Sequence, residues 1–154
     1  HRDLHSFPTR RSSDLFLDLV CGSGFFTLHL GRNGNRGIGI DRDRRSIHRA
    51  RENARLNGIE SVTFRVGDAG TFDARGHTGD TVIADPPRAG LSARARGVII
   101  GMLPRKIVYV SCNPTTFARD LRDFASAGYR LVRLIFIDMF PGTMHTEAAG
   151  ILES

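Results

Sequence analysis

Cysteine is scarce in this sequence: the 154 residues include two cysteines, Cys21 and Cys112. Neither belongs to a CxxC pair or a Cys/His cluster, which argues against a disulfide framework and a zinc site, so we expect reduced thiols and no metal. Long hydrophobic runs are also missing: no apolar stretch reaches the roughly 18 residues that span a bilayer, and no signal-peptide pattern is present. We therefore expect a cytoplasmic protein without a membrane segment.

Acidic residues are too few to balance the basic ones. The chain has 22 lysines and arginines against 16 aspartates and glutamates, which gives a formal net charge of +6 and a pI near 10.5. Lys and Arg gain affinity by releasing counterions from phosphates, so this balance favours a polyanionic partner. Many basic proteins bind no nucleic acid, so the charge alone leaves the partner open.

The beginning of the chain differs from the rest. The stretch from His1 to about Asp14 has neither helical nor strand periodicity and is rich in Ser, Arg, Asp and His. We interpret residues 1–14 as a disordered leader, or as a sequence artefact joined to one domain of ordinary size that comprises residues 15–154.

From Leu15 onward, short apolar runs alternate with helical patterns, which is typical of βα units and a parallel sheet. Helices are predicted over residues 46–58, 92–103 and 114–128. The predicted strands are Phe16–Val20, Gly37–Asp41, Val62–Val66, Thr81–Ala84, Ile107–Val110, Leu131–Ile137 and Ala148–Leu152. The pattern predicts an α/β fold with a doubly wound, mostly parallel seven-stranded sheet and helices on both faces.

Two glycines follow the first predicted strand. In "DLVCGSGFFTL", Gly22 and Gly24 would let the backbone turn tightly and approach a ligand. A dinucleotide fingerprint needs a third glycine at position 27, where this chain has Thr27, and this argues against NAD.

Acidic residues accompany three consecutive strand ends, where ligands bind in an open α/β sheet. Asp18 lies in the first strand, Asp41 ends the second and Asp68 follows the third. Asp41 could accept hydrogen bonds from both ribose hydroxyls and Asp68 one from an adenine amine. Alternatively, each is a helix cap or turn residue. Together they fit a bound adenosine, and S-adenosylmethionine has an adenosine but no phosphates, which would explain the missing third glycine.

Two further residues lie at the same predicted edge, and a third precedes the last predicted strand. Asp85 ends the fourth strand in "ADPPRAG", whose two prolines stiffen the loop. Cys112 ends the fifth strand just before a helix N-terminus, whose partial positive charge favours a thiolate, although free cysteines are more often buried space-fillers. Glu147, two residues after His145, is a carboxylate suited to moving a proton, although an HxE pair alone is common on surfaces.

Four motifs, "DLVCGSGFFTL", "DPPRAG", "SCNPTTFARDL" and "FPGTMHTE", follow one another between about Leu17 and Leu152. In this order they resemble the uracil-C5 RNA methyltransferases that modify transfer and ribosomal RNA. The resemblance implies a Rossmann-like class I methyltransferase fold, S-adenosylmethionine as cofactor and tRNA or rRNA as partner. It also implies that Cys112 attacks C6 of a flipped-out uracil, that C5 then takes the methyl group, and that Glu147 removes the C5 proton.

The resemblance extends to the other site residues. Asp85 would orient the uracil or the methionine portion of the cofactor, and Asp41 would hold the ribose. The expected cofactor-binding residues are Asp18, Gly22, Gly24, Phe26, Asp41, Asp68 and Asp85. The expected substrate-binding residues are Asp85, Arg88, Asn113 and His145.

The sequence departs from the family in several places. Members usually carry an N-terminal RNA-binding barrel and a further segment, so we interpret this chain as the C-terminal catalytic domain alone. Phe25 stands where the family commonly has a small or amide residue. With no coiled-coil pattern, we expect a monomer.

Four alternatives compete with this interpretation. A cytosine-C5 RNA methyltransferase usually has a second cysteine after the Asp-Pro run, where this chain has Pro87 and Arg88. An adenine amino-methyltransferase would have an aromatic residue at position 88. This chain has Arg88 there, which weakens that interpretation. A basic RNA-binding module that has lost catalysis and, more remotely, a metabolite dehydrogenase complete the set.

Overall fold

The computed structural model describes residues 15–73, 80–138 and 146–154, so the predicted leader lies outside the described residues. The strands are β1 Leu15–Leu19, β2 Arg36–Asp41, β3 Val62–Val66, β4 Thr81–Ala84, β5 Lys106–Ser111, β6 Arg130–Asp138 and β7 Thr146–Glu153. Every predicted strand is confirmed to within two residues at each end. The prediction succeeded because runs rich in β-branched and other apolar residues alternate with turn residues.

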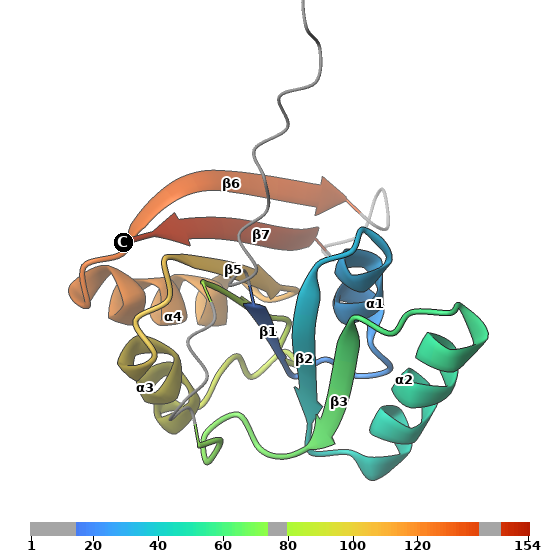
Figure 1. The fold of residues 1–154 in the computed structure, drawn as a ribbon. Helices are drawn as coiled ribbons and strands as arrows, with labels where there is room; N and C mark the ends of the chain where they lie inside the picture. Colours follow the sequence, from blue (N-terminus) through green and yellow to red (C-terminus); the bar gives the residue numbers. More distant parts are fainter. Residues whose placement is uncertain (1–14, 74–79, 139–145) are drawn as a thin grey trace, which may run out of the picture.

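The strands form one sheet in the order β3-β2-β1-β4-β5-β7-β6 (Figure 1). Strands β1 to β5 are parallel to one another. Strand β7 lies between β5 and β6 and is antiparallel to both. The order runs outward in both directions from β1 and β4, as in a doubly wound fold. The predicted fold class is therefore confirmed.

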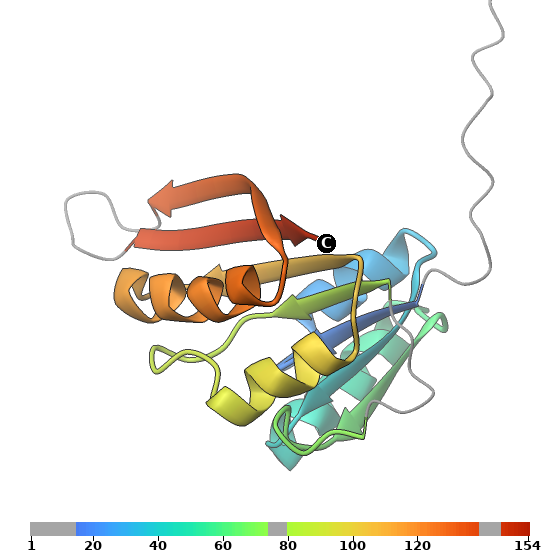
Figure 2. The ribbon, with the colours of Figure 1, turned by 90° about the vertical axis from the view of Figure 1, so that its left-hand side faces the viewer.

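Four helices cover the sheet: α1 Phe25–Arg32, α2 Arg44–Leu56, α3 Ala93–Gly101 and α4 Pro114–Ser126. Helices α1 and α2 lie on one face, and α3 and α4 lie on the other (Figure 1, Figure 2). Two apolar clusters fill the layers between, with Ile47 and Phe64 in the first and Leu17, Ile99 and Phe124 in the second. Each fully buried side chain of this size contributes about 1.5–3 kcal/mol to folding. Within the described residues, none of the helices has the length and apolar character needed to cross a membrane.

Side-chain caps set the start of three helices. Asp43 accepts hydrogen bonds from the backbone N–H groups of the first turn of α2, and Ser92 caps α3 in the same way. Asn113 caps α4, and Pro114 occupies its first turn. Such caps stabilise a helix by about 1 kcal/mol each, and they place helix N-termini at the carboxyl edge of the parallel strands.

Helix α1 was not predicted. Phe25, Phe26 and Thr27 are only moderate helix formers, and Gly31 interrupts the pattern. Tertiary packing explains the helix, because a Cβ on Gly31 would lie 2.7 Å from Val62 Cγ1. Only glycine allows α1 to approach β3 this closely.

Candidate active site

A cavity of about 450 Å³ opens at the carboxyl edge of the parallel strands. Its lining comes from the ends of β1 to β4, including Val20, Asp41, Asp68 and Pro86. The crevice outside the carboxyl ends of the strands is where open α/β sheets bind ligands, so its position favours a binding site.

The two glycines after β1 serve different purposes. Gly24 has a φ of 91°, and a Cβ there would lie 2.9 Å from the ring of Phe64 and 3.2 Å from Ala50 Cβ, so this glycine is needed for packing inside the protein. Gly22 has a φ of 54°, and a Cβ there would meet nothing within 4 Å. Of the two, Gly22 is the position at which the backbone faces open space.

Asp18 is a fully buried carboxylate with incomplete hydrogen bonding. Its Oδ2 accepts from the backbone N–H of Thr27 at 3.1 Å and from the Thr27 hydroxyl at 2.6 Å. Its Oδ1 has no hydrogen-bond partner among the described residues. Burial raises the pKa of Asp18 to about 6 against the lowering effect of the Thr27 hydrogen bonds, with smaller contributions from Asp85 and Asp41. Thr27 thus uses the third-glycine position of a dinucleotide fingerprint to hold this carboxylate.

The acidic residues at the ends of β2 and β3 accept hydrogen bonds from backbone N–H groups. Asp41 is 9% exposed, and its two oxygens each accept a 2.8 Å hydrogen bond, one from Gly22 N and one from Asp43 N. Asp68 is exposed, and its Oδ1 accepts from Gly70 N at 2.8 Å as a turn residue does. A carboxylate oxygen has two lone pairs, so both acids keep acceptor capacity toward the cavity that they line.

The strand order β4-β5-β7 brings Asp85, Cys112 and Glu147 together. Cys112 directly follows β5, and Asp85 directly follows β4 on one side of it. On the other side, antiparallel β7 begins where β5 ends, since Ser111 pairs with Ala148, which puts Glu147 beside Cys112. Partial burial raises the pKa of Asp85, and the charge of Glu147 raises it further, so the two carboxylates lie close to each other.

The cysteines occupy different environments. Cys112 is partly exposed at the strand end, whereas Cys21 is buried in the cluster formed with Phe64. Burial, followed by the charges of Asp18 and Asp41, raises the pKa of Cys21 well above its usual range. Cys21 is therefore a neutral core thiol, and Cys112 is the thiol accessible at this edge.

The loop that follows β4, residues 85–91, is fastened to the start of α4. We call it the Asp85 loop. Asn113 Nδ2 donates to Arg88 O at 3.1 Å, and Thr116 Oγ1 donates to the same carbonyl at 3.2 Å. The other end of the Asn113 amide caps α4, so both ends of the Asn113 amide are engaged within the protein. The Arg88 side chain is exposed and has no partner in the part of the chain that the structure describes.

A second fully buried carboxylate, Asp120 of α4, completes this attachment. Four donors from different elements bind it: Leu91 N at 2.8 Å, Arg96 Nη1 at 2.9 Å, Arg119 Nε at 2.8 Å and the Tyr109 hydroxyl. Arg119 Nη2 also donates to the carbonyls of Ala89 and Leu91. We call these contacts the Asp120 clamp. They fix the Asp85 loop against the helix that starts after Cys112.

Sequence reasoning missed the Asp120 clamp, although the sequence contains a signal for it. Phe117, Asp120 and Phe124 occupy positions i, i+3 and i+7 of α4, and all three are buried. An acid within an apolar helical stripe predicts a buried carboxylate, which must be paired.

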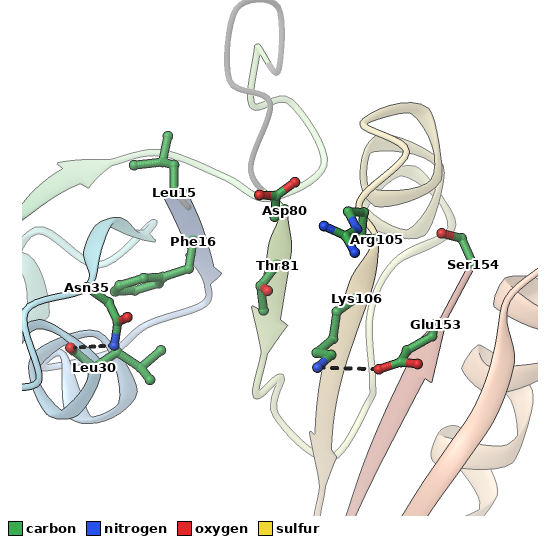
Figure 3. Close-up of a pocket in the computed structure, with 10 residues that line it drawn as sticks. All are labelled: Leu15, Phe16, Leu30, Asn35, Asp80, Thr81, Arg105, Lys106, Glu153 and Ser154. Atoms are coloured by element: carbon green, nitrogen blue, oxygen red, sulfur yellow. Dashed lines mark hydrogen bonds and ion pairs between the residues drawn. The ribbon is translucent and has the colours of Figure 1, made fainter. Parts of the chain in front are cut away.

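A second cavity, of about 470 Å³, lies at the opposite edge of the sheet (Figure 3). Lys106 and Glu153 form an ion pair of 3.3 Å there, and Asn35 donates to Leu30 O at 3.0 Å. None of the predicted site residues lines this cavity. Its location at the amino ends of the parallel strands separates it from the candidate active site.

Comparison with known proteins agrees with this geometry. A family described as "methyltransferase domain" matches residues 11–116. The chain belongs to this family. A solved methyltransferase, the tRNA (uracil-54, C5)-methyltransferase of Pyrococcus abyssi in complex with S-adenosyl-L-homocysteine, is 39% identical with a TM-score of 0.81. The alignment covers 89% of this chain and 33% of that one.

Two curated relatives extend the similarity of this methyltransferase domain. An uncharacterized RNA methyltransferase of Aquifex aeolicus is 45% identical over 89% of this chain and 33% of its own length. A 23S rRNA (uracil(1939)-C(5))-methyltransferase of Aeromonas salmonicida is 43% identical over 91% of this chain and 33% of its own length. The resemblance to uracil-C5 RNA methyltransferases is thereby confirmed. The chain spans about one third of the length of these relatives.

Within the methyltransferase domain, the predicted site residues fall into distinct groups. Those at the carboxyl edge are Asp18, Gly22, Asp41, Asp68, Asp85, Cys112 and Glu147. Those engaged in packing or hydrogen bonds within the protein are Gly24, Phe26 and Asn113. Phe26 packs beside the cluster of Ile47 and Phe64 and edge-on against Phe25 at 5.1 Å. His145 lies outside the described residues.

Proposed function

We propose that this domain transfers the methyl group of S-adenosylmethionine to C5 of a uracil in tRNA or rRNA. The observation that carries the proposal is the strand order β4-β5-β7, in which Asp85 follows β4, Cys112 follows β5, and the Ser111–Ala148 register sets Glu147 opposite Cys112. A thiol with a carboxylate opposite it on the neighbouring strand provides a nucleophile and a proton acceptor for the same base. The uracil-C5 methyltransferases to which the chain is similar support the choice of base.

Residues in and beside the cavity fit the proposed cofactor. Asp41 lines the cavity and keeps acceptor capacity suited to ribose hydroxyls. Gly22 is next to Asp41, since its N–H donates to that carboxylate, and a Cβ there would meet nothing within 4 Å. Asp18 is fully buried and does not line the cavity, but its Oδ1 has no partner among the described residues, and such an acceptor suits the ammonium group of a methionine portion. S-adenosylmethionine supplies an electrophilic methyl group on a sulfonium sulfur. The absence of a phosphate-binding third glycine is consistent with this choice.

The chain's own residues would act in the following order. Cys112, as the thiolate, adds to C6 of the uracil, and the C5–C6 electron pair moves toward C5 and the C4 carbonyl. Carbon 5 would then be nucleophilic enough to take the methyl group, the bond from that methyl carbon to the sulfonium sulfur would break, and a neutral thioether would be left. Glu147 removes the proton from C5, the C5–C6 double bond forms again, and the thiolate leaves. The Asp85 loop, held by the Asp120 clamp, would keep Asp85 beside the ring, and the base must be flipped out to reach this site.

Nucleoside analysis tests this proposal. The purified chain is incubated with methyl-labelled S-adenosylmethionine and unmodified tRNA and rRNA transcripts, and the RNA is digested and separated. We expect 5-methyluridine with the wild type and with Cys21→Ala, and none with Cys112→Ala. Labelled 5-methylcytidine, transfer that survives in Cys112→Ala, or transfer to no RNA would overturn the proposal.

A further inference from the structure

The positive charge of the chain is concentrated on one helix. Helix α2 carries five arginines against one glutamate, whereas the whole chain has a formal net charge of +6. Most of the net charge therefore lies within 13 residues. Figure 1 shows α2 at the outside of the fold, beside β3.

The buried face of α2 is narrow and leaves its basic residues exposed. Ile47, Ala50 and Ala54 are its buried residues. Positions 44, 48, 51 and 55 share one flank, since helical residues spaced by three or four align. Along this flank lie Arg44, His48, Arg51 and Arg55, and Arg45 and Arg49 follow next to it. Like charges at this spacing destabilise an isolated helix, so five arginines with Glu52 as the single acid of the helix are best suited to an anionic ligand.

Among the described residues, most of these arginines have no hydrogen-bond or ion-pair partner. Arg51 is one exception, because its guanidinium donates to Phe64 O at 2.7 Å. Arg45 is another, because it interacts electrostatically with the carboxylate of the helix cap Asp43. None of the ion pairs found among the described residues includes Arg44, Arg49 or Arg55, all of which are exposed. Their guanidinium groups are free to make bidentate contacts with phosphate oxygens.

The basic helix begins at the candidate active site. Asp41 and Arg42 line the cavity, and α2 starts two residues later at Arg44. At 1.5 Å per residue, the helix extends for about 20 Å away from the cavity mouth. The proposed base site at Cys112 follows β5, which is three strands from β2 in the sheet, or about 14 Å at roughly 4.8 Å per strand. An RNA strand whose target base lies at Cys112 could cross the cavity mouth and continue along α2.

We propose that Arg44, Arg45, Arg49 and Arg55 of α2 form a surface that binds the RNA phosphate backbone flanking the target uridine. We call it the α2 surface. It rests on the proposed function in one respect, namely that the substrate is RNA. Contacts to phosphates position a nucleic acid without reading its sequence. The α2 surface therefore contributes affinity and orientation, and the choice of uridine lies elsewhere.

The test compares two triple variants with equal loss of charge. In the first, Arg44, Arg49 and Arg55 are replaced by glutamine, which keeps helix propensity. In the control, the exposed residues Arg122, Arg130 and Arg133 are replaced in the same way. Binding of a fluorescein-labelled tRNA transcript is measured by anisotropy over a series of salt concentrations, and circular dichroism checks that both variants remain folded.

The expected result is at least a tenfold loss of affinity for the α2 variant and less than a threefold loss for the control. The slope of log K against log salt should also fall by about 2 for the α2 variant, since each lost phosphate contact removes about 0.7. Equal losses in both variants would overturn the proposal, because net charge alone would then explain them. Displacement of the RNA by polyglutamate at equal charge concentration would also overturn it, in favour of an acidic protein partner.

Failure of the proposed function is distinguishable from failure of this inference. If the wild type binds RNA through α2 but forms no 5-methyluridine, the activity is wrong and the α2 surface stands. If the wild type methylates RNA, the α2 variant should show a raised KM for RNA with kcat within twofold of wild type. An unchanged KM would contradict the α2 surface while leaving the activity intact.

Discussion

Among the described residues, two carboxylates are completely buried, and they differ in how many hydrogen-bond donors they have. Asp120 accepts hydrogen bonds from four residues, two of them arginines. Asp18 receives donors only from Thr27, and its Oδ1 is left without a partner among the described residues. A fully paired buried carboxylate holds a structure together, whereas an incompletely paired one keeps an acceptor for a further donor. The difference separates the Asp120 clamp from the cofactor site.

The largest effect should follow from removing Asp120. In Asp120→Ala the buried guanidinium of Arg96 and the Leu91 N–H lose their acceptor, so we expect a loss of about 3–5 kcal/mol in the free energy of unfolding. Urea denaturation measures it. Asp123→Ala is the control, because Asp123 also pairs with Arg96 but its side chain is 45% exposed, and it should cost about 1 kcal/mol or less. Equal losses in the two variants would show that burial does not set the strength of the Asp120 clamp.

Replacing a glycine beside the Asp120 clamp should disrupt it without removing any of the residues that form it. Gly90 has a φ of 72°, and a Cβ there would lie 2.7 Å from both Arg119 Nη2 and Asp120 Oδ2. We expect Gly90→Ala to cost about 2–4 kcal/mol, from left-handed strain together with the clash. Gly128→Ala is the matched control at the end of α4, since its φ is 98° but a Cβ meets nothing within 4 Å, and it should cost about 1–2 kcal/mol. Thermal or urea unfolding of both variants measures the difference.

Unlike Asp120, the ionised Asp18 should lower the stability of the fold and raise the affinity for the cofactor. Its pKa is about 6 in the folded protein against 3.8 ordinarily, so the unfolded chain ionises first as pH rises. The stability of the wild type should therefore fall by about 1–3 kcal/mol between roughly pH 4 and 6. In Asp18→Asn this fall should be absent, while affinity for S-adenosylmethionine drops at least tenfold. Urea unfolding at several pH values and calorimetric titration measure the two effects, and unchanged affinity would place the cofactor elsewhere.

The smallest effects should separate an arginine inside the Asp120 clamp from one on the α2 surface. Arg119 contacts Asp120 and two loop carbonyls, so Arg119→Gln should cost about 1–2 kcal/mol. Arg49 has no ion pair among the described residues, so Arg49→Gln should change stability by less than about 0.5 kcal/mol. Both are measured by urea unfolding. A larger effect for Arg49 would mean that the α2 surface has a structural role.

Much of the fold could be predicted because its signals are local. Apolar runs gave the strands, and capping residues and amphipathic patterns gave α2, α3 and α4. Helix α1 could not be predicted in this way, since it depends on the fit of Gly31 against Val62 of β3. Local propensity does not contain that contact.

The candidate site could be predicted only in part. The strand-end pattern led to Asp18, Asp41, Asp85 and Cys112 because parallel strands share one carboxyl edge. The proximity of Glu147 depends on the antiparallel insertion of β7 between β5 and β6, which the strand pattern alone does not specify.

Two further features of the site needed the structure. The close packing of Gly24 against the ring of Phe64 is a contact that the sequence does not indicate. Most contacts of the Asp120 clamp join residues 24 to 30 positions apart, so they follow only from the tertiary structure.

The central claim is that Cys112 is the nucleophile that adds to uracil. The chain is incubated with S-adenosylmethionine and an RNA transcribed with 5-fluorouridine, and the products are separated on a denaturing gel. Fluorine at C5 cannot be removed as a proton, so the covalent adduct should accumulate with the wild type and with Cys21→Ala, and it should be absent with Cys112→Ala. An adduct that persists in Cys112→Ala, or no adduct from a wild type that binds both RNA and S-adenosylmethionine, would contradict the claim.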